Sequence, residues 1–150
     1  MEKLDKRICI LMADDDEDDF FLVKEALKEN GIHNHLWQLT DGKELLDYLL
    51  KRGRFSKTQD WFSPELILLD LNMPGKDGRQ ALAEIKADPS LRKIPIIVFT
   101  TSNAAEDIRR CYELGANKYI KKPESFDVLV QLMETIVKYC TEIVEQPAIN

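Results

Sequence analysis

Short runs rich in apolar residues recur at five places along the chain, and between them apolar residues are spaced by three or four positions. An uninterrupted apolar run such as Ile-Cys-Ile-Leu-Met at residues 8–12 is typical of a strand buried on both faces of a parallel sheet. The pattern predicts strands at residues 7–13, 36–39, 65–70, 95–100 and 118–120.

The segments between these runs have the spacing of amphipathic helices. In residues 18–30, for example, Phe20, Val23 and Leu27 share one face, and Asn30-Gly31 is a usual helix stop. Capping residues are expected at Asp41 with Glu44, at Asn103 with Glu106, and at Ser125. Further helices are predicted at residues 42–50, around Leu82 and Ile85, from 103 to a stop at Gly115, and from 125 to 145.

Five strands that alternate with five helices predict a parallel sheet covered on both faces, because right-handed crossovers place each connecting helix against the sheet. We therefore expect a doubly wound, five-stranded α/β sandwich of three layers. Residues 51–63 form a long polar connection, which Trp61 and Phe62 are expected to anchor. In such folds the ligand site lies at the carboxyl ends of the strands.

Length, composition and charge indicate a small single-domain protein and disfavour several classes of function. A chain of 150 residues with 44% apolar content predicts one domain, with its core at about residues 6–145 and no room for an output domain. The net charge of −6 disfavours nonspecific binding to nucleic acid or to an anionic membrane. The apolar runs are far shorter than the roughly 20 residues that cross a bilayer, and no signal peptide is evident, so we expect a cytoplasmic protein. Cys9, Cys111 and Cys140 lack CxxC spacing, which favours buried free thiols.

Polar side chains gather where the predicted strands end. Asp14 and Asp15 follow the first strand, Asp70 ends the third, Thr100 ends the fourth, and Lys122 follows the fifth. Acids after strands often cap helices, but Asp70 is followed by Leu-Asn-Met-Pro rather than by a helix. Three carboxylates at one edge repel one another, so the cluster either takes up protons or binds a hard cation.

An oxygen-only site with spare positions suits Mg²⁺, which retains water and binds beside phosphate. With Lys122 and Thr100 added, the edge can neutralise and hydrogen-bond a phosphoryl group. Aspartate is a known phosphoryl acceptor, and phosphoryl transfer depends mainly on alignment and charge neutralisation. The sequence therefore predicts Asp70 as the acceptor.

From about Lys6 to Tyr139 the chain resembles the receiver domain of two-component response regulators, in its stand-alone, CheY-like form with a flavodoxin-like fold. The matching motifs are, in order, Asp14-Asp15 after ILMA, DLNMPGKDG from Asp70 to Gly78, Thr100, Tyr119, and Lys122-Pro123. The interval of 22 residues between Thr100 and Lys122 also suits the family.

The resemblance implies that a sensor histidine kinase phosphorylates Asp70 in the presence of Mg²⁺, for which Mn²⁺ or Ca²⁺ can substitute. The metal would be bound by Asp15, Asp70 and the backbone carbonyl of Asn72, with Asp14 acting through a bound water. Such a domain is not an enzyme beyond slow self-phosphorylation and self-dephosphorylation. It signals through phosphorylation-dependent contacts with other proteins.

The same resemblance assigns phosphoryl contacts to Thr100, to Lys122 and to the backbone N–H groups of Asn72 and Thr101. Thr100 and Tyr119 would be the switch pair: the Thr100 hydroxyl moves toward the phosphoryl group, and the Tyr119 ring turns into the space it leaves. This motion would alter the face formed by the fourth helix, fifth strand and fifth helix. In the absence of this role, Tyr119 would be an ordinary sheet residue.

Three further expectations come with the resemblance. The peptide bond before Pro123 would be cis. Thr101 is bulkier than the small residue common at that position, which bears on solvent access and on the lifetime of the phosphorylated state. The long connection at residues 51–63, with the DDDEDD, DLNMPGKDGR and TTS segments, is similar to small regulators paired with bacterial and cyanobacterial phytochrome kinases.

The last predicted helix carries more apolar residues than one sheet face needs, among them Val137, Tyr139 and Val144. We therefore expect a homodimer through the fourth helix, fifth strand and fifth helix.

Three other classes share parts of this pattern. A haloacid-dehalogenase-like phosphatase also uses an Asp nucleophile and Mg²⁺, but it places the nucleophile first and a second Asp two positions later, where this chain has Asn72. An EF-hand loop starting at Asp14 would need Gly where Asp19 stands. A flavin module of the same fold would need hydroxyl and N–H donors where the first loop is rich in carboxylates.

Overall fold

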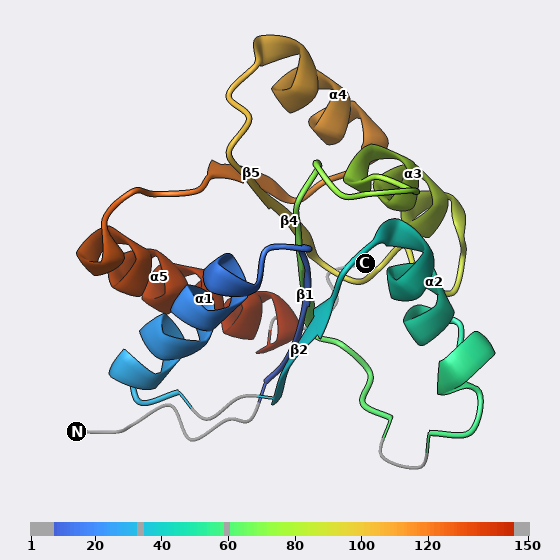
Figure 1. The fold of residues 1–150 in the computed structure, drawn as a ribbon, viewed down its shortest axis with the longest axis horizontal. Helices are drawn as coiled ribbons and strands as arrows, with labels where there is room; N and C mark the ends of the chain where they lie inside the picture. The colour runs from blue at the N-terminus through green and yellow to red at the C-terminus, as the bar shows by residue number, and fades with distance from the viewer. Residues whose placement is uncertain (1–7, 33–34, 59–60, 146–150) are drawn as a thin grey trace.

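The computed structural model describes residues 8–32, 35–58 and 61–145 of the chain (Figure 1). Among these residues, parallel strands form one sheet in the order β2-β1-β3-β4-β5. The strands are β1 (Cys9–Ala13), β2 (His35–Leu39), β3 (Leu66–Leu69), β4 (Ile96–Thr100) and β5 (Lys118–Lys121). Each predicted strand is therefore confirmed, with its ends shifted by at most two residues.

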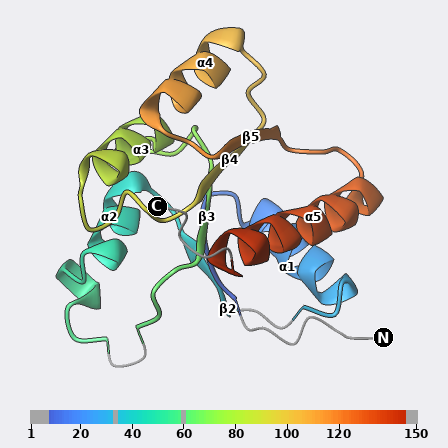
Figure 2. The ribbon, with the colours of Figure 1, turned by 180° about the vertical axis from the view of Figure 1, so that it is seen from behind.

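Helices cover both faces of this sheet. They are α1 (Glu17–Glu29), α2 (Gly42–Leu49), α3 (Gly78–Ala87), α4 (Ala105–Leu114) and α5 (Phe126–Glu145). Helices α1 and α5 pack together on one face, and α2, α3 and α4 follow one another on the other face, as the two opposite views show (Figures 1 and 2). The expected doubly wound sandwich of three layers is confirmed.

Alternating side chains of the central strands divide the core into two apolar layers. Leu11 and Ala13 of β1 face the layer under α2 and α3, whereas Ile10 and Met12 face the layer under α1 and α5. All residues of β1, β3 and β4 are buried, which is why these strands have uninterrupted apolar sequences. The sheet is thus fixed from both sides, and its carboxyl edge is a rigid support for loops.

Carboxylates cap the helices that start beside this edge. Asp16 accepts hydrogen bonds from two N–H groups of the first turn of α1, and Asp41 accepts one from Glu44 at the start of α2. Asp77 forms a capping box with Gln80 at the start of α3. These short caps let each helix begin within a few residues of a strand end.

Helix α4 begins differently from the prediction. The expected capping box of Asn103 and Glu106 is wrong, because the N-cap residue is Ala104 and no side chain caps the helix. Instead, Ser102 Oγ lies 3.5 Å from the Ala104 N–H and donates to Asp107 Oδ2 at 2.7 Å. At the other end, Gly115 adopts a left-handed φ of 109° and ends the helix as predicted.

The long connection after α2 contains a 3₁₀ turn, η1 (Gly53–Phe55), and packs through aromatic rings. The Trp61 ring stacks on Tyr48 with centroids 5.5 Å apart, and Trp61 Nε1 donates to the Tyr48 carbonyl at 2.8 Å. Tyr48 Oη in turn donates to the Phe62 carbonyl at 2.7 Å. The predicted anchoring by Trp61 and Phe62 is confirmed. Beside it, Trp37 of β2 is 46% exposed.

Within the described residues, no helix combines the length and the apolar character that a membrane span requires.

Candidate functional site at the carboxyl edge of the sheet

Backbone hydrogen bonds extend the sheet into the acidic residues that follow β1 and β3. The Asp14 N–H donates to the Leu39 carbonyl at 2.8 Å, and the Asp70 N–H donates to the Ala13 carbonyl at 2.9 Å. Strand order reverses between β1 and β3, so the two loops diverge at this point. The polar residues predicted from the strand ends therefore lie in the crevice where ligands of such folds bind.

Three of the predicted acids come together. Carboxylate oxygens of Asp14, Asp15 and Asp70 all lie within 4.8 Å of one another. Asp14 and Asp70 are 1% and 7% exposed, whereas Asp15 is exposed to solvent. A set of hard oxygen donors with one open side is the donor chemistry of a divalent cation that retains water. The residues present therefore fit such a metal ion.

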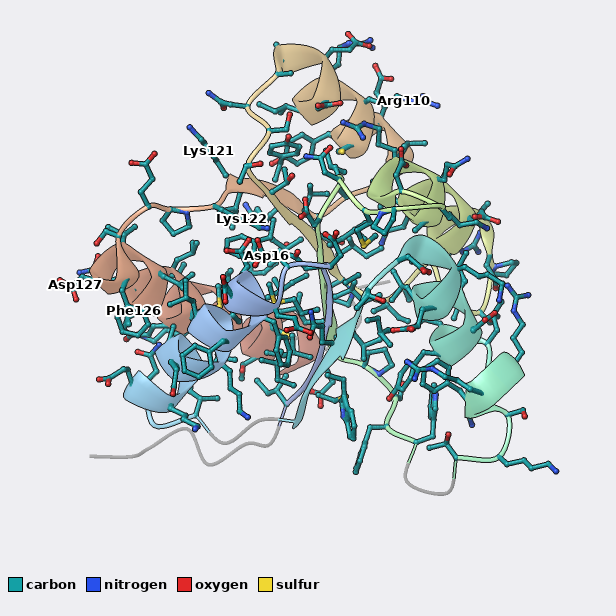
Figure 3. All side chains as sticks on the ribbon, in the orientation of Figure 1. Asp16, Arg110, Lys121, Lys122, Phe126 and Asp127 are labelled. Carbon is teal, nitrogen blue, oxygen red and sulfur yellow. The ribbon has the colours of Figure 1, made fainter. Side chains whose placement is uncertain are left out.

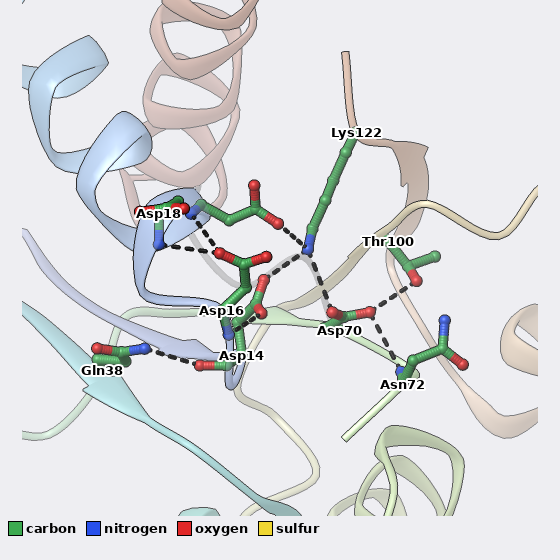
Figure 4. A network of polar contacts seen from close by, with 9 residues as sticks. Asp14, Asp16, Asp18, Gln38, Asp70, Asn72, Thr100 and Lys122 are labelled. Atoms are coloured by element: carbon green, nitrogen blue, oxygen red, sulfur yellow. Dashed lines mark hydrogen bonds and ion pairs between the residues drawn. The ribbon is translucent and has the colours of Figure 1, made fainter. Parts of the chain in front are cut away.

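The Asp70 carboxylate is held by three donors, which are drawn in Figure 4. Thr100 Oγ1 donates to Asp70 Oδ1 at 2.7 Å, and the Asn72 N–H donates to the same oxygen at 3.2 Å. Lys122 Nζ lies 3.2 Å from Asp70 Oδ2. These contacts fix the direction of a buried carboxylate before any ligand binds.

Lys122 reaches the site because its backbone continues the sheet, with its N–H donating to the Thr100 carbonyl at 2.8 Å. Its neighbour Lys121 extends outward at the surface, while Lys122 lies inside the edge (Figure 3). Lys122 Nζ is 2.7 Å from Asp14 Oδ2 and 2.7 Å from Asp19 Oδ2. Burial alone would lower the pKa of Lys122, but hydrogen bonds to Asp14 and Asp19 raise that pKa above its ordinary value, so the side chain is a permanent cation.

For Asp14, burial outweighs the hydrogen bonds in setting the pKa. Burial raises the pKa of its carboxyl group to about 6, against the hydrogen bonds from Lys122 and from the Asp16 N–H, which lower it. The carboxylates at this edge outnumber the single ammonium group, so the site has an excess of negative charge that an added cation would relieve.

The loop after β3 is tied to its surroundings at two glycines. A Cβ at Gly78 would lie 2.2 Å from the Asp70 carbonyl oxygen, and a Cβ at Gly42 would lie 2.5 Å from the Lys76 carbonyl oxygen. The N–H of Gly78 donates to the Leu71 carbonyl at 3.1 Å, and that of Gly42 donates to the Lys76 carbonyl at 2.9 Å. Only glycine permits this close approach, which fixes the backbone on both sides of Asn72.

The two remaining predicted residues lie beside the carboxylates rather than among them. Thr101 is exposed and follows Thr100 at the end of β4. Tyr119 on β5 is partly buried, and its hydroxyl donates to the Ser102 carbonyl at 2.9 Å. Tyr119 thus contacts the loop that carries Thr101.

The ion pair of Asp107 and Arg79 also contacts the loop after β4, through Ser102. Asp107 of α4 accepts the hydroxyl of Ser102 at 2.7 Å and the Nε of Arg79 at 3.0 Å. Sequence patterns do not reveal these contacts. Arg79 lies 28 residues from Asp107, and each residue alone is a common surface type.

The structure also departs from the expectation at Pro123: the described residues contain no cis peptide bond, so the predicted cis peptide is wrong. Trans is the lower-energy isomer before proline, and Lys122 reaches the carboxylates in that form. The contact of Asp19 with Lys122 was not predicted from the sequence. Only its place in the first turn of α1, set by the Asp16 cap, distinguishes it from the neighbouring acids.

The residues around Asp70 are suited to holding a phosphoryl group. A buried carboxylate faces a hydroxyl, an ammonium group and a backbone N–H, beside acids that suit a divalent cation. A phosphoryl group on Asp70 would meet hydrogen-bond donors and positive charge, which is what stabilises phosphoryl transfer.

Known response regulators are similar to this chain. The family model described as the response regulator receiver domain matches residues 10–134. Response regulator Rcp1 of Synechocystis sp. is 40% identical over 139 residues, which cover 93% of this chain and 92% of that protein.

Solved structures give the same result. The phosphorylated cyanobacterial phytochrome response regulator RcpA has a TM-score of 0.84 at 36% identity, with 95% of this chain and 100% of that chain covered. The Mn²⁺-bound form of Rcp1 has a TM-score of 0.81 at 39% identity, with 94% and 99% covered. Response regulator RPA3017, from red light signalling of R. palustris, has a TM-score of 0.82 at 31% identity, with 88% and 92% covered.

Proposed function

Because the chain belongs to the response regulator receiver domain family of two-component systems, we propose that Asp70 is its phosphoacceptor. The observation that carries this assignment is the set of donors around the Asp70 carboxylate: the Thr100 hydroxyl, the Asn72 N–H and the Lys122 ammonium. Asp70 is also buried at the switch point of the sheet, where the fold places its ligand.

In the proposed reaction, the donor is a phosphohistidine of a sensor histidine kinase. An Asp70 carboxylate oxygen forms a bond to phosphorus while the bond from phosphorus to the imidazole nitrogen breaks. The electron pair of that bond stays on the nitrogen, and because the other ring nitrogen keeps its proton, a neutral histidine leaves. Thr100 and Lys122 then donate to phosphoryl oxygens, together with the N–H groups of Asn72 and Thr101.

A divalent cation binds receiver domains, and the cluster of Asp14, Asp15 and Asp70 fits one. We propose Mg²⁺ as the ion, with Asp15, Asp70 and the Asn72 carbonyl as ligands and Asp14 acting through a bound water. When bound, the ion supplies positive charge that offsets the carboxylates and the incoming phosphoryl oxygens. The similar protein Rcp1 has a solved Mn²⁺-bound form, which supports binding of a divalent ion.

The test is incubation of the protein with a small phosphodonor and Mg²⁺, followed by intact-mass measurement. The wild-type chain should gain one phosphoryl group, and it should gain none when the metal is chelated. Asp70→Asn should gain none, while Asp18→Asn, an equal change of charge on the exposed start of α1, should gain one. A phosphoryl group retained in Asp70→Asn would overturn the assignment of the acceptor.

The phosphatase alternative has no support here. Position 72, where such an enzyme needs its second acid, is Asn72, whose N–H is turned toward Asp70. The relatives named above are response regulators. We propose that the chain signals in the cytoplasm through phosphorylation-dependent protein contacts, with slow self-phosphorylation and self-dephosphorylation as its only chemistry.

The partner that supplies the phosphoryl group belongs to the histidine kinase class, since receiver domains receive their signals from such kinases. We propose a phytochrome as that kinase. The similarity to a phytochrome response regulator and to a regulator of red light signalling supports this pairing.

We also propose a homodimer through the face formed by α4, β5 and α5, although the expectation that Val137 adds to this face is wrong. Val137 is 1% exposed and belongs to the core, so it does not add to an external stripe. Val144 lies where side chains are not described, and Tyr139 packs partly against the core. Tyr112 of α4, at 47% exposed, takes their place as an apolar surface on this face. Light scattering at tens of micromolar that gives the mass of a monomer, with and without a phosphoryl analogue, would contradict the dimer.

A further inference from the structure

Lys122 makes an ion pair that the proposed function does not use. Its Nζ lies 2.7 Å from Asp19 Oδ2, as close as it lies to Asp14 and closer than the 3.2 Å to Asp70. The side chain of Asp19 is 31% exposed, against 9% for Lys122 and 1% for Asp14. Asp19 is therefore the partner of Lys122 that lies nearest to solvent, outside the three acids that suit a metal ion.

The start of α1 aims Asp19 at Lys122. Asp16 caps the helix and accepts hydrogen bonds from the N–H groups of Asp18 and Asp19, at 2.9 Å and 3.1 Å, which fixes the first turn. Successive residues of a helix point about 100° apart, so Asp18 faces solvent while Asp19 faces the sheet edge. Acids in a first turn are common because they suit the helix dipole, but the dipole does not explain a contact that spans 103 residues.

The space beside the contact between Asp19 and Lys122 is small and mostly apolar. Asp19 and Lys122 line a small cavity of about 30 Å³, whose wall otherwise consists of apolar side chains and Pro123. Such a space holds about one water molecule. The Lys122 Nζ therefore lies between Asp19 on the α1 side and Asp70 on the other side.

An ammonium group has three N–H donors, and the three carboxylates of Asp14, Asp19 and Asp70 use all of them. A phosphoryl group on Asp70 brings further anionic oxygens that need a donor from Lys122. One of these oxygens can replace the contact of Lys122 with Asp70, and the others compete for the two remaining N–H donors. Asp14 is buried in the acidic cluster, whereas Asp19 is 31% exposed and can be solvated when it releases the ammonium group.

We propose that Asp19 is a positioning residue that competes with the phosphoryl group for the Lys122 ammonium. In the free domain Asp19 holds Lys122 toward α1. In the phosphorylated domain this pull weakens the contact between Lys122 and the phosphoryl oxygens. Asp19 thereby limits the stability of the phosphorylated state, and this role rests on the proposed function of Asp70.

The experiment is a titration with beryllofluoride, a phosphoryl analogue, in the presence of Mg²⁺, followed by calorimetry on the full chain. Asp19→Asn should bind the analogue about three to five times more tightly than wild type, the factor that one partly exposed ion pair can supply. Asp19→Glu, which restores the carboxylate, should return the affinity toward that of wild type. An affinity of Asp19→Asn equal to or weaker than wild type would overturn the proposal.

Two controls separate this effect from a general change of charge. Asp18→Asn removes the same charge one residue away, on the exposed side of α1, and should leave the affinity close to wild type. In a Lys122→Met background, Asp19→Asn should have no further effect, because the competition requires the ammonium group. Equal tightening by Asp18→Asn and Asp19→Asn would show a long-range charge effect and contradict the specific role.

The outcomes also distinguish this inference from the proposed function. If wild-type protein fails to bind beryllofluoride, or binds it equally well as Asp70→Asn, the assignment of Asp70 is wrong. If binding depends on Asp70 but Asp19→Asn behaves like Asp18→Asn, only the role of Asp19 is wrong.

Discussion

At the scale of single residues, the three thiols of the chain are held out of reach of solvent. Cys9, Cys111 and Cys140 are all free and buried, as the sequence predicted. Burial raises the pKa of Cys9 and of Cys140 to about 11, and the nearby charge of Glu65 adds to the effect. The folded state therefore favours the protonated thiols. Below the ordinary thiol pKa both the folded and the unfolded chain are protonated at these positions, so Cys9 and Cys140 do not change the free energy of unfolding there. The free energy of unfolding falls as the pH rises from there toward 11.

We expect iodoacetamide at pH 8 to modify these thiols slowly in the native protein and rapidly in urea, because the thiolate is the reactive form. Mass spectrometry of peptides would measure each site. A variant with an exposed thiol, Ser63→Cys, provides the matched control and should react rapidly at that position without urea. Rapid native modification of Cys9 or Cys140 would contradict the prediction.

Site residues at the ends of strands could be predicted from the sequence. Asp19 could not, because its contact depends on how helix α1 is rotated about its axis. Asp14, Asp70 and Thr100 end or follow buried apolar runs, so parallel strands bring them together whatever the details of packing. Asp19 stands in a run of acids, and its contact with Lys122 depends on where α1 starts and on the angle at which it lies.

At the scale of elements, helix α4 begins without a side-chain cap of its own. Its N-cap, Ala104, offers no side-chain acceptor, and Ser102 and Asp107 supply the polar contacts of the first turn. Arg79 of α3 donates to Asp107 and so ties the two helices together. The hydrogen bond from Ser102, with the pairing to Arg79, lowers the pKa of Asp107, so the carboxylate stays ionised near neutral pH.

We expect Asp107→Ala to loosen the start of α4. Backbone amides of residues 105–108 should exchange with deuterium several times faster, and the free energy of unfolding should fall by about 1 kcal/mol, as for a lost capping interaction. Glu106→Ala, on the exposed side of the same turn, is the control and should change exchange at these amides much less. Unchanged exchange in Asp107→Ala would show that α4 is held by other contacts.

The α4 start also shows why capping patterns in sequence mislead. Asn103 and Glu106 have the right spacing, but capping by tertiary contacts replaces the local box here. At Asp41, by contrast, the cap lies at the polar residue that the sequence predicts.

At the scale of the whole molecule, the sheet separates two apolar layers that do not share side chains. Leu82 of α3 is 0% exposed in one layer, and Met133 of α5 is 0% exposed in the other. Both layers rest on the same strands, so we expect a single cooperative unfolding transition.

We expect Leu82→Ala and Met133→Ala each to lower the free energy of unfolding by about 2 to 5 kcal/mol. The double variant should show the sum of the two losses to within about 0.5 kcal/mol, because the residues lie on opposite faces of the sheet. Urea titrations followed by far-ultraviolet circular dichroism would measure all three. A strongly non-additive result would show that the sheet transmits packing changes between the layers.

The architecture at this scale was the most predictable feature of the chain. Alternation of five apolar runs with amphipathic segments leaves few topologies once crossovers are right-handed. A homodimer face is harder to predict, because the apolar stripe of a helix does not reveal how many of its residues the sheet covers. Val137 belongs to that covered part.

The aromatic packing of the connection after α2 has a practical optical consequence. The chain has two tryptophans: Trp61 is stacked on Tyr48, and Trp37 lies partly exposed on β2. Neither indole contacts the carboxylates of the site through any described hydrogen bond or ion pair. Intrinsic fluorescence will therefore respond to loosening of that connection and to unfolding, but hardly to a ligand at Asp70. A reporter of phosphorylation in this receiver has to be introduced near the site.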